Sequence, residues 1–134
     1  MTDAEDACPT GLPMIRTIAM PADTNPEGDI FGGWLMSQMD LAGATLAYNE
    51  AKGRCATVAA NEIVFFKPVM VGDEVSVYCQ VKAIGRTSVT VFIEAWRRSR
   101  KSPDTERVTS GVFTYVAIGD DRRPRPVKPQ EALS

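Results

Sequence analysis

Five stretches of the chain have the composition and spacing of β-strands, and each ends at glycine, proline or other turn residues. Apolar and polar residues alternate most regularly in EVSVYCQVKAI, where Val75 and Val77 fall on one face and Ser76 and Gln80 on the other. Such alternation is typical of a strand with one buried face, because successive side chains of a strand point to opposite sides. The predicted strands cover residues 14–20, 55–69, 74–84, 88–100 and 107–118.

A long apolar stretch between the first two predicted strands has helical character. Residues 32–52 are rich in alanine, leucine, methionine and glycine and contain no proline, so they predict one long helix, which Gly53 would close. No second helix is available for a parallel crossover, so we expect an α+β fold with an antiparallel sheet packed around one central helix. Because the helix is apolar nearly all round, we expect a second copy of the chain to help cover it.

The chain has 134 residues, the length of one domain. A domain of this size buries roughly two-thirds of the surface that its unfolded chain exposes, so we expect one real core. We predict a flexible leader over residues 1–13, the folded domain over 14–119 and a tail over 120–134. The tail is rich in proline and arginine, and we expect it to stay outside the core.

The absence of histidine is the most informative feature of the composition. Imidazole is the commonest general base and a very common metal ligand, so Ser-His-Asp, Cys-His and His-ligated metal chemistry are excluded, and we expect no metal site. Acid-base work would fall to carboxylates, lysine, tyrosine or cysteine.

Cysteine usage and hydropathy predict the compartment. Three cysteines without a C-x-x-C spacing indicate reduced thiols in a cytoplasmic protein. The acidic N-terminus does not resemble a signal peptide, and no apolar run reaches the roughly 18 residues that a membrane helix needs. We therefore expect a soluble protein that makes no contact with membranes.

Charge is distributed unevenly along the chain. Residues 1–96 hold 6 basic and 12 acidic side chains, and residues 97–134 hold 9 basic and 5 acidic ones, giving about −6 and +4. The basic part could receive a phosphate-bearing ligand or could be a solvated surface. It lacks the interleaved arginines and aromatics of a nucleic-acid groove, so no nucleic-acid partner is expected.

Asp40 lies near the middle of the predicted apolar helix. Its neighbours at three and four positions, Met36, Ser37, Gly43 and Ala44, include no cation, so a carboxylate buried there would have no charge partner on its own helix. Such an arrangement is costly and is characteristic of functional sites. The alternative is that Asp40 is exposed or pairs with a lysine or arginine from elsewhere in the fold.

The motifs around this helix resemble those of a known family. The stretch TIAMPADTNPEGDIFGGWLMSQMDLAGA, followed by KPVMVGDEV and by GRTS between two predicted strands, is similar to the hotdog-fold acyl-CoA thioesterases, most closely the bacterial YciA type. The resemblance spans about residues 16–119. It implies a single hotdog domain with the sheet wrapped around the helix, and at least a homodimer, often a hexamer built as a trimer of dimers. It also implies hydrolysis of acyl-CoA thioesters at the dimer interface without a cofactor, since coenzyme A belongs to the substrate.

The resemblance also assigns catalytic roles. Asp40 matches the family's catalytic carboxylate, which would activate water as a general base or attack the thioester directly. Gly32 and Gly33 at the helix N-terminus would offer backbone N–H groups to the developing oxyanion. Asn25 matches an asparagine that orients water or substrate, expected across the dimer interface. Glycines before a helix and an asparagine before proline are also ordinary turn residues, and Asp29 is expected to order the loop.

Coenzyme A would be held by a separate set of residues. Arg86, Thr87 and Ser88 in GRTS resemble the family's nucleotide-binding turn, and a guanidinium with two hydroxyls suits phosphate recognition; a hairpin with a solvated arginine is the alternative. Residues 58–61 are expected to line the pantetheine channel. The further coenzyme A candidates are Lys67, Val58, Ala59, Ala60 and Asn61, with Arg122, Arg123 and Arg125 as weaker phosphate candidates.

Two functions remain after these assignments. An acyl-CoA thioesterase needs the uncompensated Asp40, whereas a non-catalytic acyl-CoA-binding regulatory module would keep GRTS and the basic tail but have no use for that carboxylate. Dehydration of hydroxyacyl thioesters, a second activity of hotdog proteins, relies on a histidine that this chain lacks. We expect Trp34, Met36 and Met39 to belong to the core rather than to an acyl pocket.

Overall fold

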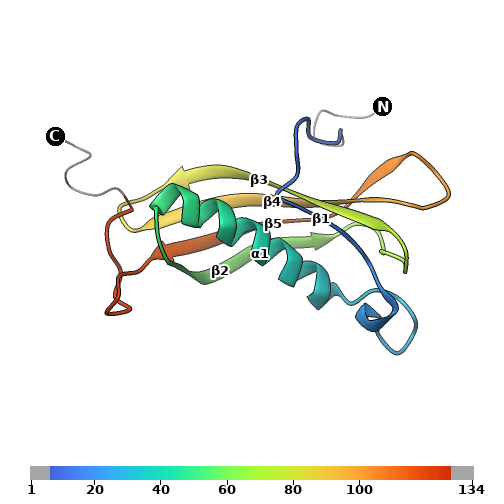
Figure 1. Cartoon of the computed structure of the whole chain (residues 1–134), viewed down its shortest axis with the longest axis horizontal. Coiled ribbons are helices and arrows are strands. Elements are labelled where there is room, and N and C mark those ends of the chain that lie inside the picture. The colour runs from blue at the N-terminus through green and yellow to red at the C-terminus, as the bar shows by residue number, and fades with distance from the viewer. Residues whose placement is uncertain (1–6, 128–134) are drawn as a thin grey trace.

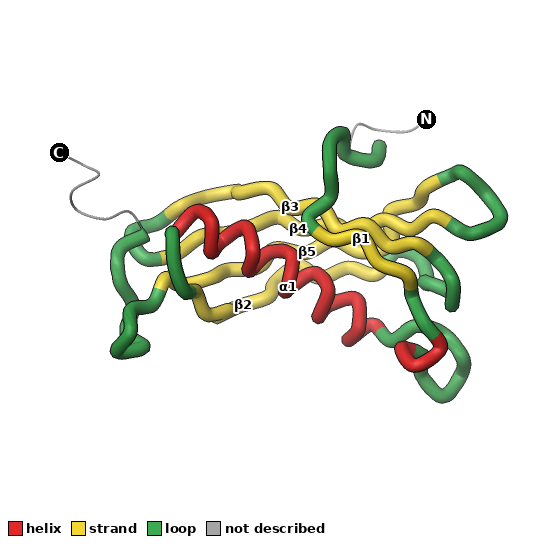
Figure 2. Tube along the Cα trace, viewed as in Figure 1, coloured by secondary structure: helices red, strands yellow, loops and turns green. Residues whose placement is uncertain are grey.

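The computed structural model describes residues 7–127 as one antiparallel sheet with a long helix lying across one of its faces (Figure 1). The strand order is β1-β3-β4-β5-β2, so β1 and β2 form the two edges. The tube view shows the helix following the length of the sheet (Figure 2). The elements are β1 (Ile15–Ile18), the short 3-10 helix η2 (Pro21–Asp23), α1 (Gly32–Ala51), β2 (Cys55–Phe65), β3 (Glu74–Ile84), β4 (Ser88–Arg98) and β5 (Thr105–Ala117).

The predicted α+β architecture is confirmed, with small shifts at the ends of elements. β2 stops at Phe65, four residues before the predicted end, because the chain then passes into Pro68, which has no N–H to donate to a neighbouring strand. The helix ends at Ala51, and its left-handed cap is Lys52 (φ 53°) rather than the predicted Gly53. Gly53 instead leaves room for the Arg125 side chain, because a Cβ at position 53 would lie 2.5 Å from the Arg125 guanidinium.

The core lies between α1 and the sheet. Val89, Val91 and Ile93 of β4 are fully buried on the face toward the helix, where they meet Met39, among other helix residues. The opposite side of the helix is not covered in the single chain, since the Leu41 side chain is 58% exposed. The prediction that one sheet face leaves part of the apolar helix uncovered is therefore confirmed.

The prediction that the tail stays outside the core is wrong at Val127. This residue is 1% exposed and belongs to the core, and its N–H donates to the Arg86 carbonyl at 2.9 Å. Arg125 anchors the same segment, because its guanidinium donates to the carbonyls of Ile118, Pro126 and Ala51 at 3.3, 3.0 and 3.0 Å. One apolar side chain and one guanidinium, which reaches the last carbonyl of α1, thus dock a segment whose composition is polar.

Arg125 is expected to stabilise the fold rather than to bind phosphate. Arg125→Ala removes a charged donor from three carbonyls, so we expect the free energy of unfolding to fall by about 1–3 kcal/mol, measured by urea denaturation. Arg123→Ala is the matched control, because that side chain is exposed and its loss should change stability by less than about 0.5 kcal/mol. Equal stability of the two variants would contradict this role.

The N-terminal segment from residue 7 lies on the sheet face that points away from α1. The Cys8 thiol is half-buried and donates to the Tyr78 hydroxyl at 3.7 Å. Residues 1–6 of the predicted leader and 128–134 of the predicted tail lie outside the described residues. Within residues 7–127 no helix combines the length and the apolar character needed to cross a membrane.

Candidate active site

The Asp40 carboxylate is held from one side by two hydroxyl groups. Its Oδ1 accepts hydrogen bonds from Thr57 Oγ1 at 2.8 Å and from the Tyr115 hydroxyl at 3.1 Å. The side chain is half-buried, and in residues 7–127 no cation forms an ion pair with it and no donor reaches Oδ2. One oxygen is thus fixed and the other is free to meet a ligand.

The sheet register places the two donors side by side. Thr57 on β2 and Tyr115 on β5 are directly paired in the antiparallel ladder, so their side chains point to the same face, toward α1. A register shift follows immediately between Thr57 and Ala59. Pairing across two neighbouring strands therefore brings two hydroxyls to one carboxylate oxygen of the helix.

Tyr115 reaches Asp40 from beneath the helix, where Gly43 makes room for it. Tyr115 is fully buried, and a Cβ at Gly43 would clash with its hydroxyl and lie 2.5 Å from Ile93 Cδ1. Burial raises the pKa of Tyr115, and the nearby Asp40 carboxylate raises it further. The phenol consequently keeps its proton and acts as a donor to Asp40.

The N-terminus of α1 presents unpaired backbone donors. The first intrahelical acceptor is the Phe31 carbonyl, which takes the N–H groups of Trp34 and Leu35. The N–H groups of Gly32 and Gly33 have no acceptor within the described chain, and the first turn carries no acidic side chain. Together with the positive end of the helix dipole, these donors can stabilise a developing negative charge.

Asn25 organises the loop that leads into the helix. Its Oδ1 accepts the N–H groups of Glu27 and Asp29, each at 3.0 Å, and its own N–H donates to the Asp29 carbonyl at 2.7 Å. Both lone pairs of the amide oxygen are therefore used inside the loop, which is the ordinary turn role foreseen for this residue. The amide NH₂ group has no partner among the described residues and remains available as a donor.

The predicted catalytic residues form two groups within one chain. Asn25 and Gly32 line a pocket of about 380 Å³ together with Phe65 and Lys67, and Asp40 is absent from its lining. Gly32 and Asp40 lie eight residues apart on α1, which corresponds to about 12 Å along the helix axis. The N–H of Gly32 and the carboxylate of Asp40 thus cannot reach the same carbonyl group within one subunit.

Comparison with known proteins places this arrangement in a family. The model of the thioesterase superfamily matches residues 27–103, more than half of the chain and all of α1. The chain belongs to the thioesterase superfamily. The superfamily match covers Gly32, Gly33, Asp40 and the turn at Arg86, and leaves out Asn25.

Individual relatives in the superfamily are similar over most of their length. The acyl-CoA thioester hydrolase YciA of Salmonella typhimurium is 47% identical over 128 residues, 93% of this chain and 96% of that protein. A hexameric broad-specificity acyl-coenzyme A thioesterase, solved with an aspartate replaced by alanine, is 44% identical with a TM-score of 0.85, covering 90% of this chain and 89% of the other. A hexameric hotdog fold thioesterase of Campylobacter jejuni is 40% identical with a TM-score of 0.84, covering 92% and 93%. The predicted hotdog fold is confirmed.

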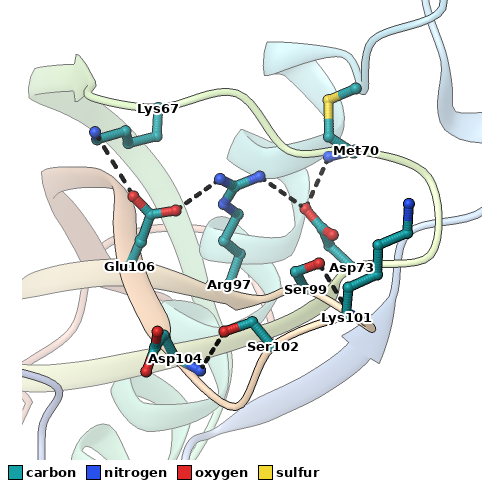
Figure 3. A network of polar contacts seen from close by, with 9 residues as sticks. All are labelled: Lys67, Met70, Asp73, Arg97, Ser99, Lys101, Ser102, Asp104 and Glu106. Carbon is teal, nitrogen blue, oxygen red and sulfur yellow. Dashed lines mark hydrogen bonds and ion pairs between the residues drawn. The ribbon is translucent and has the colours of Figure 1, made fainter.

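Lys67 lines the pocket beside Asn25 and Gly32, but its ammonium group already has an acidic partner. The ammonium group is 3.6 Å from Glu106, which also accepts a hydrogen bond from Arg97 at 2.6 Å (Figure 3). Arg97 in turn donates to the buried Asp73 at 3.1 Å, and the Glu106 contact is the main cause that raises the pKa of Arg97. This network ties the end of β4 to the start of β3, so Lys67 has a structural contact besides any role toward phosphate.

The GRTS turn lies at the other end of the molecule, near the C-terminal end of α1 (Figure 1). Its backbone is fixed, because Thr87 and Ser88 carbonyls accept the N–H groups of Ala117 and Gly85, each at 2.8 Å. The Arg86 side chain is exposed and has no ion-pair partner in the described residues. A rigid turn thus carries an uncompensated guanidinium into solvent.

The residues predicted for the pantetheine channel follow Thr57, which contacts Asp40, along β2. Val58, Ala59, Ala60 and Asn61 directly follow Thr57 on β2, whose outer edge has no neighbouring strand in the described sheet. Val58 is 57% exposed and falls at the register shift, outside the paired positions. In the described sheet this edge offers unpaired backbone N–H and C=O groups a few residues along β2 from Thr57, which holds Asp40.

Sequence reasoning missed Thr57 and Tyr115, the two residues that hold Asp40. A role for Tyr115 could have been suspected, because its side chain falls on the apolar face of a strand with alternating residues. A hydroxyl buried on such a face needs a hydrogen-bond partner. Met39 is fully buried in the core, as expected, and Trp34 packs against the core.

Burial raises the pKa of the Cys79 thiol to about 12 and also raises that of Cys55, so both stay protonated. Residues 7–127 contain no cluster of three or more histidine, cysteine, aspartate or glutamate side chains arranged for a metal.

Proposed function

We propose that this chain is an acyl-CoA thioester hydrolase, which converts fatty acyl-CoA and water to a carboxylic acid and free coenzyme A. The observation that carries the proposal is the Asp40 carboxylate, whose Oδ1 is held by two hydroxyls while Oδ2 meets no donor from residues 7–127. Relatives named as acyl-CoA thioester hydrolases, similar along almost the whole chain, support the substrate class.

Asp40 Oδ2 would act on the thioester carbonyl in one of two ways. It removes a proton from an attacking water molecule, or it attacks the carbonyl carbon and forms an anhydride that water then opens. In either route the C–S bond breaks, and coenzyme A leaves as a thiolate that takes up a proton. In both routes the carbonyl oxygen becomes negative and needs donors, which the N–H groups of Gly32 and Gly33 supply. These steps require only water, the Asp40 side chain and backbone N–H groups, and no resident cofactor is included in the proposal.

The reaction requires a second copy of the chain. Because Gly32 and Asp40 of one subunit lie about 12 Å apart along α1, we assign Asp40 of one copy and Gly32 with Asn25 of another to the same site. The exposed Leu41 on α1 and the half-exposed Phe65 on β2 provide apolar surface for such contact. A homodimer is the minimum assembly, and the hexameric relatives support a trimer of dimers.

Arg86 is proposed to bind the phosphates of the nucleotide portion of coenzyme A. Arg86→Ala should raise KM for acyl-CoA about tenfold or more, while KM for the same acyl group on pantetheine, which lacks the nucleotide, should stay within about twofold. Initial rates measured with both esters test this. Arg100→Ala, which removes an exposed arginine of the β4–β5 loop that is not a coenzyme A candidate, serves as the control. An equal change with both esters would remove Arg86 from the phosphate site.

The competing function is a regulatory module that binds acyl-CoA without hydrolysing it. Free thiol release from acyl-CoAs of several chain lengths, followed with a chromogenic disulfide, separates the two. Steady turnover supports the enzyme, whereas tight binding without thiol release supports the module. The free cysteines at positions 8, 55 and 79 fit a reducing compartment, so we place the reaction in the cytoplasm.

A further inference from the structure

We propose that Tyr115 is a positioning residue for hydrolysis, which fixes the Asp40 side chain so that Oδ2 points to the substrate. This inference rests on the proposed function of Asp40. The Tyr115 hydroxyl lies 3.1 Å from Asp40 Oδ1 and 3.2 Å from the Asp40 backbone carbonyl, so a single phenol contacts both the side chain and the main chain of that residue.

The geometry restricts how the carboxylate can turn. An aspartate side chain has two rotatable bonds, and in a helix its carboxylate would otherwise sample several orientations. Two donors on the same oxygen, from Thr57 at 2.8 Å and from Tyr115, select one orientation and leave the second oxygen unbonded. A group held in this way loses little freedom when the substrate arrives, which favours reaction.

Tyr115 is better suited than Thr57 to define the position, because its side chain is packed on all sides in the core. Thr57 lies on the edge strand β2 and is exposed, whereas Tyr115 is fully buried and stacks on Phe113 with ring centroids 6.4 Å apart. Gly43 on α1 leaves the space that the phenol occupies, since a Cβ there would clash with the hydroxyl. Gly43 on the helix and Tyr115 on the strand therefore together permit this contact.

The buried phenol also has the protonation state that the role requires. Burial and the adjacent Asp40 charge both raise the pKa of Tyr115, so its hydroxyl stays protonated at neutral pH and can donate to Asp40. Tyr115 does not contact the reacting atoms, because its hydroxyl faces the oxygen of Asp40 that is already occupied. Its effect on the reaction would pass entirely through Asp40.

Tyr115→Phe tests the proposal, because it keeps the ring and removes only the donor. We expect kcat for acyl-CoA hydrolysis to fall about tenfold, the loss of one hydrogen bond to a charged group, while KM stays within about twofold. Tyr78→Phe is the matched control, since it removes a tyrosine hydroxyl on β3 that contacts Cys8 and not Asp40. Circular dichroism and the melting temperature report whether each variant is folded.

A double-mutant cycle distinguishes positioning from a purely structural role. In the Asp40→Asn background, Tyr115→Phe should change the residual rate less than twofold, because the group that it positions is already inactive. An additional tenfold loss in that background, or a folded Tyr115→Phe enzyme with the wild-type kcat, would overturn the proposal. Absence of hydrolysis by the wild-type protein would instead refute the proposed function and is recognised before any variant is measured.

Discussion

Asp40→Asn is expected to lower kcat for acyl-CoA hydrolysis by about 100- to 10,000-fold, the range typical of removing a general base. The amide oxygen of asparagine still accepts the hydrogen bonds of Thr57 and Tyr115, so the local structure should be kept. Asparagine cannot take a proton from water or form an anhydride, and the loss should therefore appear in kcat and not in binding. Rates of thiol release and the affinity for a slowly turned-over acyl-CoA measure the two effects separately.

The control for this change is Asp104→Asn. Asp104 lies in the exposed β4–β5 hairpin, and neutralising it alters the net charge by the same amount. Its activity should stay within about twofold of wild type, because surface substitutions of this kind have small effects. An Asp40→Asn protein that retained more than a tenth of the wild-type rate would remove the carboxylate from the mechanism.

Gly32→Pro is expected to lower kcat by about 100- to 1000-fold, the usual result of losing one oxyanion donor. Gly32 is the first residue of α1, its N–H has no intrahelical acceptor, and proline is well tolerated at that position. Phe31 before it has a ψ of 135°, an extended conformation that a following proline accepts. The substitution therefore removes a donor to the substrate with little cost to the helix.

Gly32→Ala is the matched control for the proline variant. Both side chains place a Cβ about 3.2 Å from the Phe65 ring, but alanine keeps the N–H. We expect the alanine variant to stay within about threefold of wild type, since Phe65 is half-exposed and can adjust. Equal losses in the two variants would indicate that contact with Phe65, and not the N–H, is responsible.

Mixing the two inactive variants tests whether the site is shared. If Asp40 and Gly32 of one site come from different subunits, a heterodimer of Asp40→Asn and Gly32→Pro has one site with both changes and one intact site. Random association makes about half of the dimers mixed, so co-expression should restore about a quarter of wild-type activity. Co-expressed variants that remain as inactive as each alone would show that both groups act within one subunit.

Local sequence patterns were sufficient for the secondary structure and for the main candidate residue. Alternation in 74–84 predicted β3 to the residue, because a half-buried strand imposes a period of two. The apolar stretch from Gly32 predicted α1, and Asp40 stood out because no neighbour on the same helix could neutralise it. These inferences depend on residues close together in the chain, and they needed no knowledge of the packing.

Interactions between distant residues were beyond such patterns. Arg125 docks onto the end of α1 because its guanidinium donates to the Ala51 carbonyl, and Val127 joins the core where its N–H donates to the Arg86 carbonyl. Neither partner is visible in the sequence of the tail itself. Lys67 acquired its partner Glu106 in the same way, through the pairing of β5 with its neighbours. Composition predicted a tail outside the core, and Lys67 was a coenzyme A candidate without a known partner, because composition gives no information on which residues lie opposite one another.

The sequence by itself determined that this protein has a carboxylate, Asp40, near the middle of an apolar helix, no histidine to assist it and glycines at the helix start. Only the tertiary structure decided which oxygen of that carboxylate is free. That outcome depends on the register between β2 and β5, which pairs Thr57 with Tyr115, and on Gly43, which lets the phenol reach Asp40. Register and close approach follow from packing of the whole sheet against the helix, so spacing along the chain does not contain them.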